Sequence, residues 1–271
     1  MIKISIVTIS FNQFKFLKDC MSSVISQMTE EIEYIVVDPG SSDGSRKYIQ
    51  SYGSKIKTVF DLDSGPSDGL NNGFSKAKGQ YYYFLNSDDI LLPGAVNSML
   101  LAIKNNILAD VFCFRGYLVD EDLFHLRYMR TFNFSAKRFC RGNTSIYQQG
   151  LLFSSFRFKQ VGGFNKDNKT CWDAELAVKM SLRGAQFIDM PDIISYFRIY
   201  STSITGSANN LIENSKNKNR LFKLTFNKKP SLFNKFIYHI VKFEKYFYFD
   251  YLAKYLHLKI MNFKKKSANQ L

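Results

Sequence analysis

Two adjacent carboxylates, Asp88 and Asp89, follow the aromatic and aliphatic run YYYFLN (residues 81–86) after a single serine, Ser87. A carboxylate at the end of a buried strand suits a hard divalent cation, Mg²⁺ or Mn²⁺, which completes its coordination with substrate phosphates and water. Asn86 could add a hydrogen bond to a ribose. Taken alone, the same residues could also simply turn the chain and cap the following helix.

A second pair of acids, Asp173 and Glu175, lies in the segment WDAEL at the start of a predicted helix. The helix dipole favours negative charge there, and either carboxylate could act as a general base if it faces the site. The alternative is a first-turn acid pair that only stabilises the helix. Trp172, the one tryptophan, either stacks on a sugar or fills the core.

Asp38, in the segment VVDPGSSDGS, could accept a hydrogen bond from a nucleotide base or a ribose hydroxyl. Its alternative is an ordinary Asp-Pro-Gly turn, and Asp43 in the same segment is more simply the cap of the next helix. No G-x-G-x-x-G follows the first predicted strand, and no G-x-x-x-x-G-K-[ST] occurs. Nucleotide phosphates, if bound, would therefore be handled by carboxylates and a metal.

The elements that would position these residues form an α/β pattern. Four strand-like runs, residues 4–9, 32–38, 57–63 and 80–86, alternate with stretches of helical length. This alternation predicts a parallel sheet with right-handed crossovers, in which the carboxyl ends of the strands form one ligand-binding rim. The polar residues at these ends are Thr8 to Asn12, Asp38 to Ser42, Asp61 to Ser64 and Asn86 to Asp89.

Further elements are predicted up to about residue 205, where the body of the fold would end. They are a helix (94–105), a strand (110–116), a hairpin (117–132), a strand with a short helix (150–165), a helix (171–184) and two short strands (185–190 and 193–200).

The composition favours a globular cytoplasmic protein. The 271 residues can bury a sizeable core, and 45% hydrophobic with 22% charged residues is an ordinary balance. The four cysteines form no C-x-x-C pair, so neither a zinc site nor a disulfide framework is expected. The N-terminus lacks a signal-peptide pattern, and no apolar run of about 18 residues predicts a spanning helix. Any membrane contact would be peripheral.

The net charge of +14 is concentrated near the C-terminus, because residues 211–271 hold 14 Lys and Arg against three acids, a net of +11. Apolar residues recur at helical spacing from Leu232 to Leu258, and three lysines follow at 264–266. Such a helix fits an anionic membrane surface, contacted through residues 211–266. The alternatives are packing on the rest of the chain or in a homodimer. Nucleic-acid binding is disfavoured because no binding module accompanies the charge.

Taken together, the ordered segments resemble the family 2 glycosyltransferases, which are inverting enzymes of the GT-A fold, and especially bacterial members that build surface polysaccharides. The motifs are SIVTISFNQ, EYIVVDPGSSDGS, DSGPSDGLNNGFSKAKGQYYYFLNSDD, QQGLLFSSFRFKQVGGFN, WDAEL and FRIYSTSIT. The resemblance implies a GT-A domain over residues 1–205, a mostly parallel α/β sheet sandwiched by helices. Within it, residues 1–90 would bind the nucleotide and 91–205 the acceptor, and a basic aromatic helical tail (206–271) would follow.

The resemblance also implies roles at the donor end of the site. The residues expected near the nucleotide sugar are Thr8, Ser10, Asn12, Asp38 (at the base, most often uracil), Asp68, Asn71, Asn72, Asn86, Ser87 and Arg198. Asn86 to Asp88 occupy the D-x-D motif of the family, which makes Asp88 the expected metal ligand, with Asp89 beside it as a possible second.

At the acceptor end, Asp173 matches the family's general base, with Glu175 in reserve, and either Gln148 or Gln149 would border the donor sugar or the acceptor. Three positions depart from the family pattern. Asn86 replaces the first Asp of D-x-D, Trp172 replaces the Glu before the base, and Tyr200 replaces a His that can approach the metal or diphosphate.

The implied activity is metal-dependent transfer of a sugar, by a single displacement, from a nucleotide sugar (most often a UDP-sugar) to a hydroxyl of a glycan or lipid-linked oligosaccharide. O-antigen or capsule assembly at the inner face of the cell membrane would use it. A sugar nucleotidyltransferase would need a glycine-rich basic loop where SFNQFKF stands. A noncatalytic membrane-surface binding protein would show no metal-dependent turnover.

Overall fold

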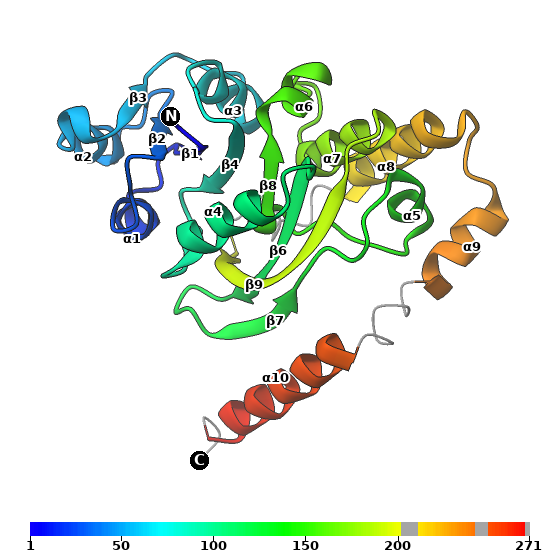
Figure 1. The fold of residues 1–271 in the computed structure, drawn as a ribbon. Helices are drawn as coiled ribbons and strands as arrows, with labels where there is room; N and C mark the ends of the chain where they lie inside the picture. Colours follow the sequence, from blue (N-terminus) through cyan, green and yellow to red (C-terminus); the bar gives the residue numbers. More distant parts are fainter. Residues whose placement is uncertain (202–210, 242–248, 269–271) are drawn as a thin grey trace.

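The computed structural model describes residues 1–201, 211–241 and 249–268 (Figure 1). Its first half contains β1 (Ile4–Ile9), α1 (Phe14–Ile25), β2 (Ile32–Val37), α2 (Ser45–Gln50), the 3-10 turn η1 (Gly53–Lys55), β3 (Lys57–Val59), α3 (Pro66–Ser75) and β4 (Tyr81–Asn86). β1 pairs in parallel with β2 and β4, and β2 pairs in parallel with β3. The parallel sheet predicted from the alternation is therefore confirmed.

The second half extends the same sheet. Its elements are β5 (Ile90–Leu91), α4 (Ala95–Asn105), β6 (Val111–Val119), β7 (His125–Met129), α5 (Ala136–Arg141), the 3-10 turn η2 (Gln148–Gly150), β8 (Leu151–Ser154), α6 (Ser155–Gln160), α7 (Trp172–Leu182) and β9 (Phe187–Arg198). The strand order is β3-β2-β1-β4-β8-β6-β9-β5, and β7 pairs with β6. Because β8 runs antiparallel to both β4 and β6, it joins the two halves edge to edge.

The central strands are buried on both faces, which explains why they read as nearly continuous apolar runs. Along β2, Tyr34 and Val36 face a cluster that includes Leu17 of α1 and Met99 of α4. The intervening Ile35 and Val37 face the opposite cluster, which is formed with α3, α6 and α7. Helices therefore cover both sides of the sheet, as Figure 1 shows, and the chain has the predicted α/β sandwich.

Three details differ from the predicted elements. β3 is only three residues long: it is an edge strand that pairs with β2 alone, and residues 60–63 of the expected strand pair with no neighbouring strand of the described chain. Neither β5 nor α5 was predicted from the sequence. The two short strands expected at 185–190 and 193–200 form the single strand β9, in which a register shift opposite Cys113 to Arg115 accommodates Pro191 as a bulge.

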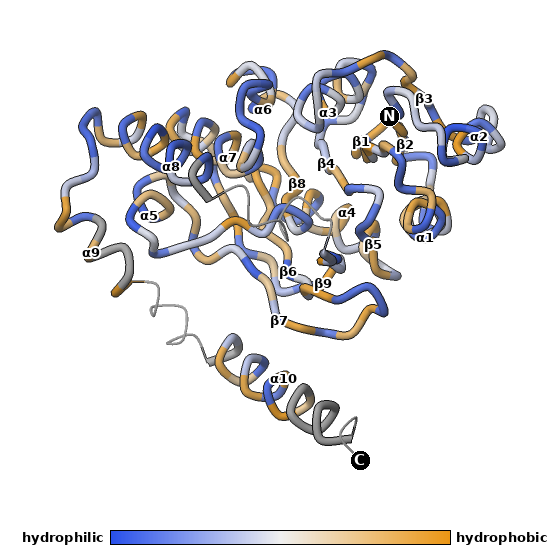
Figure 2. The backbone as a smooth tube through the Cα atoms, turned by 180° about the vertical axis from the view of Figure 1, so that it is seen from behind, coloured by the Kyte–Doolittle hydropathy of each residue, from blue (hydrophilic) through white to orange (hydrophobic). Residues whose placement is uncertain are grey.

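The C-terminal region forms α8 (Leu211–Phe226), α9 (Leu232–Val241) and α10 (Phe249–Ala268). α8 packs on α5 and α7, where Leu221 is fully buried, and α10 packs on β7 through Tyr251 and Leu258. Hydrophobic and hydrophilic residues alternate along the part of α10 that is coloured in Figure 2. α8 therefore packs directly on the rest of the fold.

The single stripe expected from Leu232 to Leu258 is divided between α9 and α10. Lys242, Glu244 and Phe247 of that stripe, the boundary at 205/206 and residues 202–205 of the last motif lie outside the described residues. None of the described helices is both long enough and apolar enough to cross a membrane.

Candidate active site

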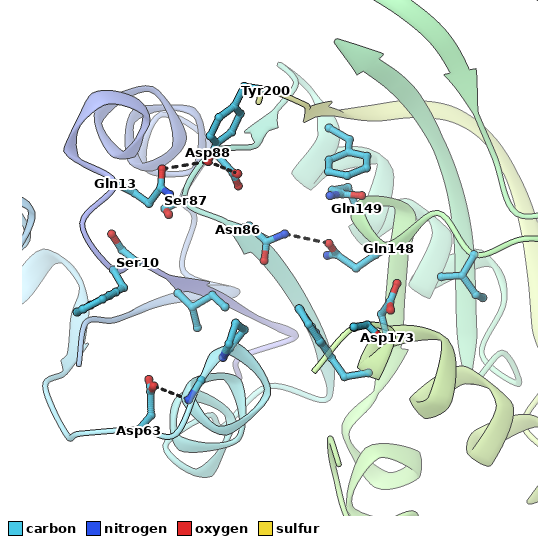
Figure 3. A pocket seen from close by; sticks show the side chains of 18 of the residues that line it. Ser10, Gln13, Asp63, Asn86, Ser87, Asp88, Gln148, Gln149, Asp173 and Tyr200 are labelled. Atoms are coloured by element: carbon cyan, nitrogen blue, oxygen red, sulfur yellow. Dashed lines mark hydrogen bonds between the residues drawn. The ribbon is translucent and has the colours of Figure 1, made fainter. Parts of the chain in front are cut away.

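A cavity of about 820 Å³ opens at the carboxyl ends of β1 and β4, between the two halves of the chain (Figure 3). The polar residues that line it from the first half are Ser10, Gln13, Asp63, Asn86, Ser87 and Asp88. Those from the second half are Arg127, Tyr147, Gln148, Gln149, Thr170, Trp172, Asp173 and Tyr200. The cavity thus lies at the carboxyl ends of the parallel strands, where the sequence predicted a ligand site. Residues far apart in the sequence complete its lining.

Asp88 presents its carboxylate to this cavity from the turn after β4. The Tyr200 hydroxyl donates a hydrogen bond to its Oδ2 (3.0 Å) and also lies 3.3 Å from Oε1 of Gln13. Burial raises the pKa of Asp88, while the Tyr200 hydrogen bond and the charge of Arg198 oppose that rise. The carboxylate is thus half-buried but still reaches the cavity, as a cation ligand must.

Asp89 faces the opposite way and does not line the cavity, which corrects its placement as a possible second metal ligand. It is 1% exposed. Its Oδ2 accepts hydrogen bonds from Gln149 (2.8 Å) and Asn86 (3.2 Å), and its Oδ1 accepts one from the backbone N–H of Arg198 (3.0 Å). Burial, followed by the neighbouring Asp88, raises the pKa of Asp89 well above its ordinary value. This carboxylate fastens β4 to η2 and β9.

The same contacts explain why residue 86 is asparagine. The Asn86 side-chain amide donates to Asp89 Oδ2 and to Gln148 Oε1, both at 3.2 Å. An aspartate here would place a second carboxylate against these two acceptor oxygens with no proton to offer them. The departure from D-x-D is therefore linked to the buried Asp89. Gln148 and Gln149 both line the cavity, so the structure does not distinguish which of them corresponds to the glutamine expected from the family resemblance.

Asp173 lines the cavity from the first turn of α7, and its carboxylate accepts no hydrogen bond from another side chain among the described residues. Burial raises the pKa of this carboxyl, although the backbone amides at the helix start act in the opposite direction. A raised pKa suits a group that must accept a proton. Position and electrostatics therefore agree with the chemistry of a general base.

Glu175 does not reach the cavity, although it lies only two residues further on. It is 1% exposed and accepts hydrogen bonds from Arg220 (2.8 Å to Oε1) and Asn168 (2.8 Å to Oε2), with Lys179 3.1 Å away. Burial alone would raise its pKa, but these hydrogen bonds outweigh burial and lower the pKa to about 2. A carboxylate with such a low pKa is a poor proton acceptor. Glu175, expected as the alternative general base, therefore does not fit that role here, and its hydrogen bonds stabilise the start of α7.

On the side of the cavity formed by the first half of the chain, two buried polar atoms lack hydrogen-bond partners in the part of the chain that the structure describes. Ser10 lines the cavity and its Oγ has no hydrogen bond in the described chain. Asp38 does not itself line the cavity but precedes the lining residue Pro39 in the chain. Its Oδ1 accepts hydrogen bonds from Gly40, Ser41 and Arg46, whereas its buried Oδ2 has no hydrogen-bond partner among the described residues. Such orphaned atoms fit a polar ligand, because a buried group without a hydrogen bond is costly.

Thr8 and Asn12 do not line the cavity, contrary to expectation. Thr8 is fully buried, and its Oγ1 accepts a hydrogen bond from Tyr34 (2.9 Å) within the core. Asn12 connects two strand-end loops, since its backbone N–H donates to Ser41 and its Oδ1 accepts from Ser42 (both 2.9 Å). These two residues therefore stabilise the strand ends beside the cavity.

The residues of α3 expected near the nucleotide sugar, Asp68, Asn71 and Asn72, do not line the cavity. Asp68 forms an ion pair with Lys166 (2.5 Å), and the side chain of Asn71 both donates to and accepts from the backbone of Phe164 (2.9 and 3.0 Å). Asp68 and Asn71 therefore fasten the segment before α7 to α3.

Arg198 is 2% exposed and does not reach the cavity. Its guanidinium lies over the ring of Phe16 (4.5 Å to the centroid), and its Nη2 is 3.6 Å from the Asp19 carboxylate. It contributes positive charge behind Asp88 instead of touching a ligand directly.

Sequence reasoning did not single out Gln13, Asp63 or Tyr147, all of which line the cavity. Asp63 belonged to a strand end that the sequence marked as polar, and its pKa is raised by burial. Its position in the cavity could have been predicted by treating every acidic residue at a strand end as a candidate site residue. Tyr147 precedes η2, and no local pattern distinguishes it.

The residues that line the cavity fit a divalent cation that is coordinated mainly by phosphate oxygens of a bound substrate. Among residues 1–201, 211–241 and 249–268, no group of three or more His, Cys, Asp or Glu side chains is arranged to hold a metal by itself. Asp88 offers one carboxylate to the cavity. A hard cation bound by one or two carboxylates and by phosphate oxygens needs no larger cage.

A carboxylate-lined cavity at the edge of a mostly parallel sheet, closed by an antiparallel strand and a second set of helices, defines a GT-A-like transferase. The chain belongs to the glycosyltransferases of family 2: the family described as Glycosyl transferase family 2 matches residues 5–161. The match includes Asp88 and ends before Asp173.

Relatives and solved structures agree with this assignment. An uncharacterized glycosyltransferase of Rickettsia typhi is 26% identical over 217 residues, or 78% of this chain and 68% of the relative. The GalNAc(5)-diNAcBac-PP-undecaprenol beta-1,3-glucosyltransferase of Campylobacter jejuni is 33% identical over 115 residues, or 41% of this chain and 37% of that protein. S. aureus TarS 1-349, solved in complex with UDP-GlcNAc, has the same fold, with a TM-score of 0.69 at 16% identity over 91% of this chain and 73% of that one.

Proposed function

We propose that this glycosyltransferase moves a sugar from a nucleotide-sugar donor, most simply a UDP-sugar, to a hydroxyl of a glycan or lipid-linked oligosaccharide in bacterial surface polysaccharide biosynthesis. The observation that carries the proposal is that Asp88 and Asp173, from the two halves of the chain, line one cavity. Support for the substrates comes from TarS, solved with UDP-GlcNAc, and from the Campylobacter jejuni relative, named for an undecaprenol-linked substrate.

In this proposal Asp173 accepts the proton of the acceptor hydroxyl while that oxygen attacks the anomeric carbon. General-base catalysis of this kind contributes about 10²- to 10⁴-fold to the rate. A single displacement inverts the anomeric centre, and no covalent bond between sugar and protein forms. The orphaned Ser10 Oγ and Asp38 Oδ2 would bind the nucleoside end of the donor, which keeps the anomeric carbon oriented toward Asp173.

Asp88 would hold Mg²⁺ or Mn²⁺ together with the donor's phosphate oxygens, and the cation when bound would neutralise charge that grows on the leaving diphosphate. Tyr200 donates its hydroxyl hydrogen bond to Asp88 in the free protein. The same hydroxyl is placed to donate to a phosphate oxygen once Asp88 is engaged, which gives a function to the residue that replaces the family's histidine.

A two-stage experiment tests the proposal. UDP-, GDP- and dTDP-sugars are first screened for thermal stabilisation with and without Mn²⁺, and turnover of the best binder is then measured as nucleotide release in the presence of a bacterial lipid extract. We expect the Asp88→Asn and Asp173→Asn variants to stay folded and lose transfer, and Asp167→Asn, an exposed acid before α7, to keep it. Full transfer in both active-site variants would refute the assignment.

We further propose that the C-terminal region binds an anionic membrane surface on the cytoplasmic side. The supporting observation is the apolar face of α9, where Leu232, Phe233, Phe236 and Ile240 are 84%, 69%, 63% and 50% exposed. These residues fall at helical spacing on one face, and the region from 211 onward carries a net charge of +11. A lipid-linked acceptor would be met at that surface.

Vesicle flotation tests this second proposal. The Phe233→Ser/Phe236→Ser variant should lose binding to vesicles that contain phosphatidylglycerol, while neutral phosphatidylcholine vesicles bind little of either protein. Phe156→Ser is the matched control, because Phe156 on α6 is 65% exposed but lies on the body of the fold. Equal flotation of the α9 variant and the control would contradict the proposal.

A further inference from the structure

Helix α8 braces the segment that carries Asp173. Leu221 of α8 is fully buried against Ala177 and Val178 of α7 and Phe134 near α5. This apolar contact places the preceding turn of α8 beside the start of α7. A helix that the sequence assigned to a basic tail is therefore packed directly behind the catalytic segment.

Arg220 connects α8 to the first turn of α7. Its Nη1 donates to Oε1 of Glu175 at 2.8 Å, and its Nη2 donates to Oε2 of the same carboxylate. Two parallel hydrogen bonds between a planar guanidinium and a carboxylate fix direction as well as distance, which a lysine ammonium cannot do. Glu175 lies two residues after Asp173, so this fork fixes the turn from which Asp173 projects.

Asn217, one turn earlier on α8, connects to the loop before α7. Its Nδ2 donates to Oδ1 of Asn168 (3.0 Å) and lies 3.1 Å from Oγ1 of Thr170. Asn168 is 1% exposed; its Oδ1 also accepts from the backbone N–H groups of Thr170 and Cys171, and its Nδ2 donates to Glu175. The loop and the helix start are thus held from one side by one helix.

Neither Arg220 nor Asn217 lines the cavity, whereas Thr170, Trp172 and Asp173 do. No side chain among the described residues hydrogen-bonds the Asp173 carboxylate, so its direction depends on the backbone from which it projects. We propose that Arg220 and Asn217 are positioning residues, which orient Asp173 toward the acceptor hydroxyl. This inference rests on the proposed role of Asp173 as the base.

Two variants test the inference without leaving a buried charge unpaired. Arg220→Lys keeps the ion pair with Glu175 but loses the fork, and Asn217→Ala removes the link to Asn168. Each is expected to lower kcat by about 10- to 100-fold, the scale of a small misplacement of a catalytic group. Affinity for UDP, measured by calorimetry, should stay within about twofold, because the donor end lies elsewhere in the cavity. Lys223→Ala, an exposed residue of α8, is the matched control and should match the wild type.

The pH profile of kcat separates positioning from general structural support. A loosened α7 start would expose Asp173 more, which removes part of the burial that raises its pKa, so the acidic limb should move to lower pH in Arg220→Lys. The double variant Glu175→Gln/Arg220→Gln removes both charges together. A double variant with the melting temperature of the wild type but a low kcat would support a positioning role for Arg220. A double variant in which both the melting temperature and kcat equal those of the wild type would overturn that role.

Other results also overturn the inference. Wild-type kcat in folded Arg220→Lys and Asn217→Ala proteins would do so, and so would a fall in kcat matched by an equal loss of UDP affinity. The proposed function fails separately: if Asp173→Asn keeps full transfer, Asp173 is not the base whatever Arg220 does. If Asp173→Asn is inactive while both α8 variants are normal, only the positioning inference is wrong.

Discussion

Glutamine in place of Glu175 should lower the stability of the folded chain and make that stability less dependent on acid. The carboxyl has a pKa of about 2 in the folded protein, against an ordinary value of 4.5. The folded state therefore binds this proton more weakly than the unfolded state. The stabilisation is fully present above pH 4.5 and is lost as the pH falls through about 2.

The expected magnitude follows from that difference in pKa. At about 1.4 kcal/mol per pKa unit, it corresponds to roughly 3 kcal/mol of stability at neutral pH. The side chain of Arg220 is 43% exposed, so solvent screening reduces the figure to about 2 kcal/mol. About 1 kcal/mol of this should already be lost at pH 3.5, where the unfolded carboxyl is mostly protonated and the folded one is not.

Urea unfolding monitored by Trp172 fluorescence provides the assay, because Trp172 is the one tryptophan of the chain and begins the same helix. The free energy of unfolding of wild type and Glu175→Gln would be compared at pH 7, 5 and 3.5. We expect a gap of about 2 kcal/mol at pH 7 that narrows by about 1 kcal/mol at pH 3.5. Glu31→Gln, at an exposed glutamate, should show no gap at any pH.

A gap that stays constant or widens on acidification would refute this reasoning. It would mean that the pKa of Glu175 is ordinary or raised in the folded protein. The hydrogen bonds from Arg220 would then contribute less to the stability of the ionised carboxylate than their geometry indicates.

Three further outcomes are expected. The kcat of transfer should fall with decreasing pH around a value above 3.8, because burial raises the pKa of Asp173 and only its ionised form accepts a proton; a limb at or below 3.8 would contradict this. Gly73→Ala should destabilise the fold by about 1–3 kcal/mol in urea unfolding, since its Cβ would lie 2.6 Å from Val7 Cγ1 in the core; unchanged stability would show that the strand can shift. A chain of residues 1–229 should elute as a folded protein in size-exclusion chromatography, whereas 1–210 should aggregate because the loss of α8 exposes the apolar surface of α7; equal behaviour would contradict the packing of α8.

Much of the fold could be predicted because its signals are local. Apolar runs predicted the parallel strands, and helical spacing predicted the crossover helices. The position of Asp88 just after a predicted strand indicated that it lies at the carboxyl edge of the sheet. The bulge in β9 could not be predicted, because Pro191 reads as a strand break unless the opposing strand β6 supplies a register shift. Short elements such as β5 depend on partners far away in the chain.

The candidate site was predictable at the level of segments and less so at the level of side chains. Asp88 and Asp89 are neighbours with the same chemistry, yet one faces the cavity and the other the interior. Likewise, Ser10 lines the cavity, whereas Thr8 is buried in the core. Which member of a polar pair turns inward is decided by distant partners, such as Gln149 for Asp89, and no local pattern contains that information.

The sheet order also has a consequence for biosynthesis. β8 lies between β4 and β6, and β9 lies between β6 and β5, so strands made late are inserted between strands made early. While the ribosome is still making the second half, the nascent β4 keeps one edge without a partner, and such edges favour aggregation or chaperone binding. The cavity, which needs Tyr200 as well as Ser10, is completed only after β9 has been made. The lining groups of the first half, Ser10 and Asp88 among them, are therefore made well before the groups that complete the cavity.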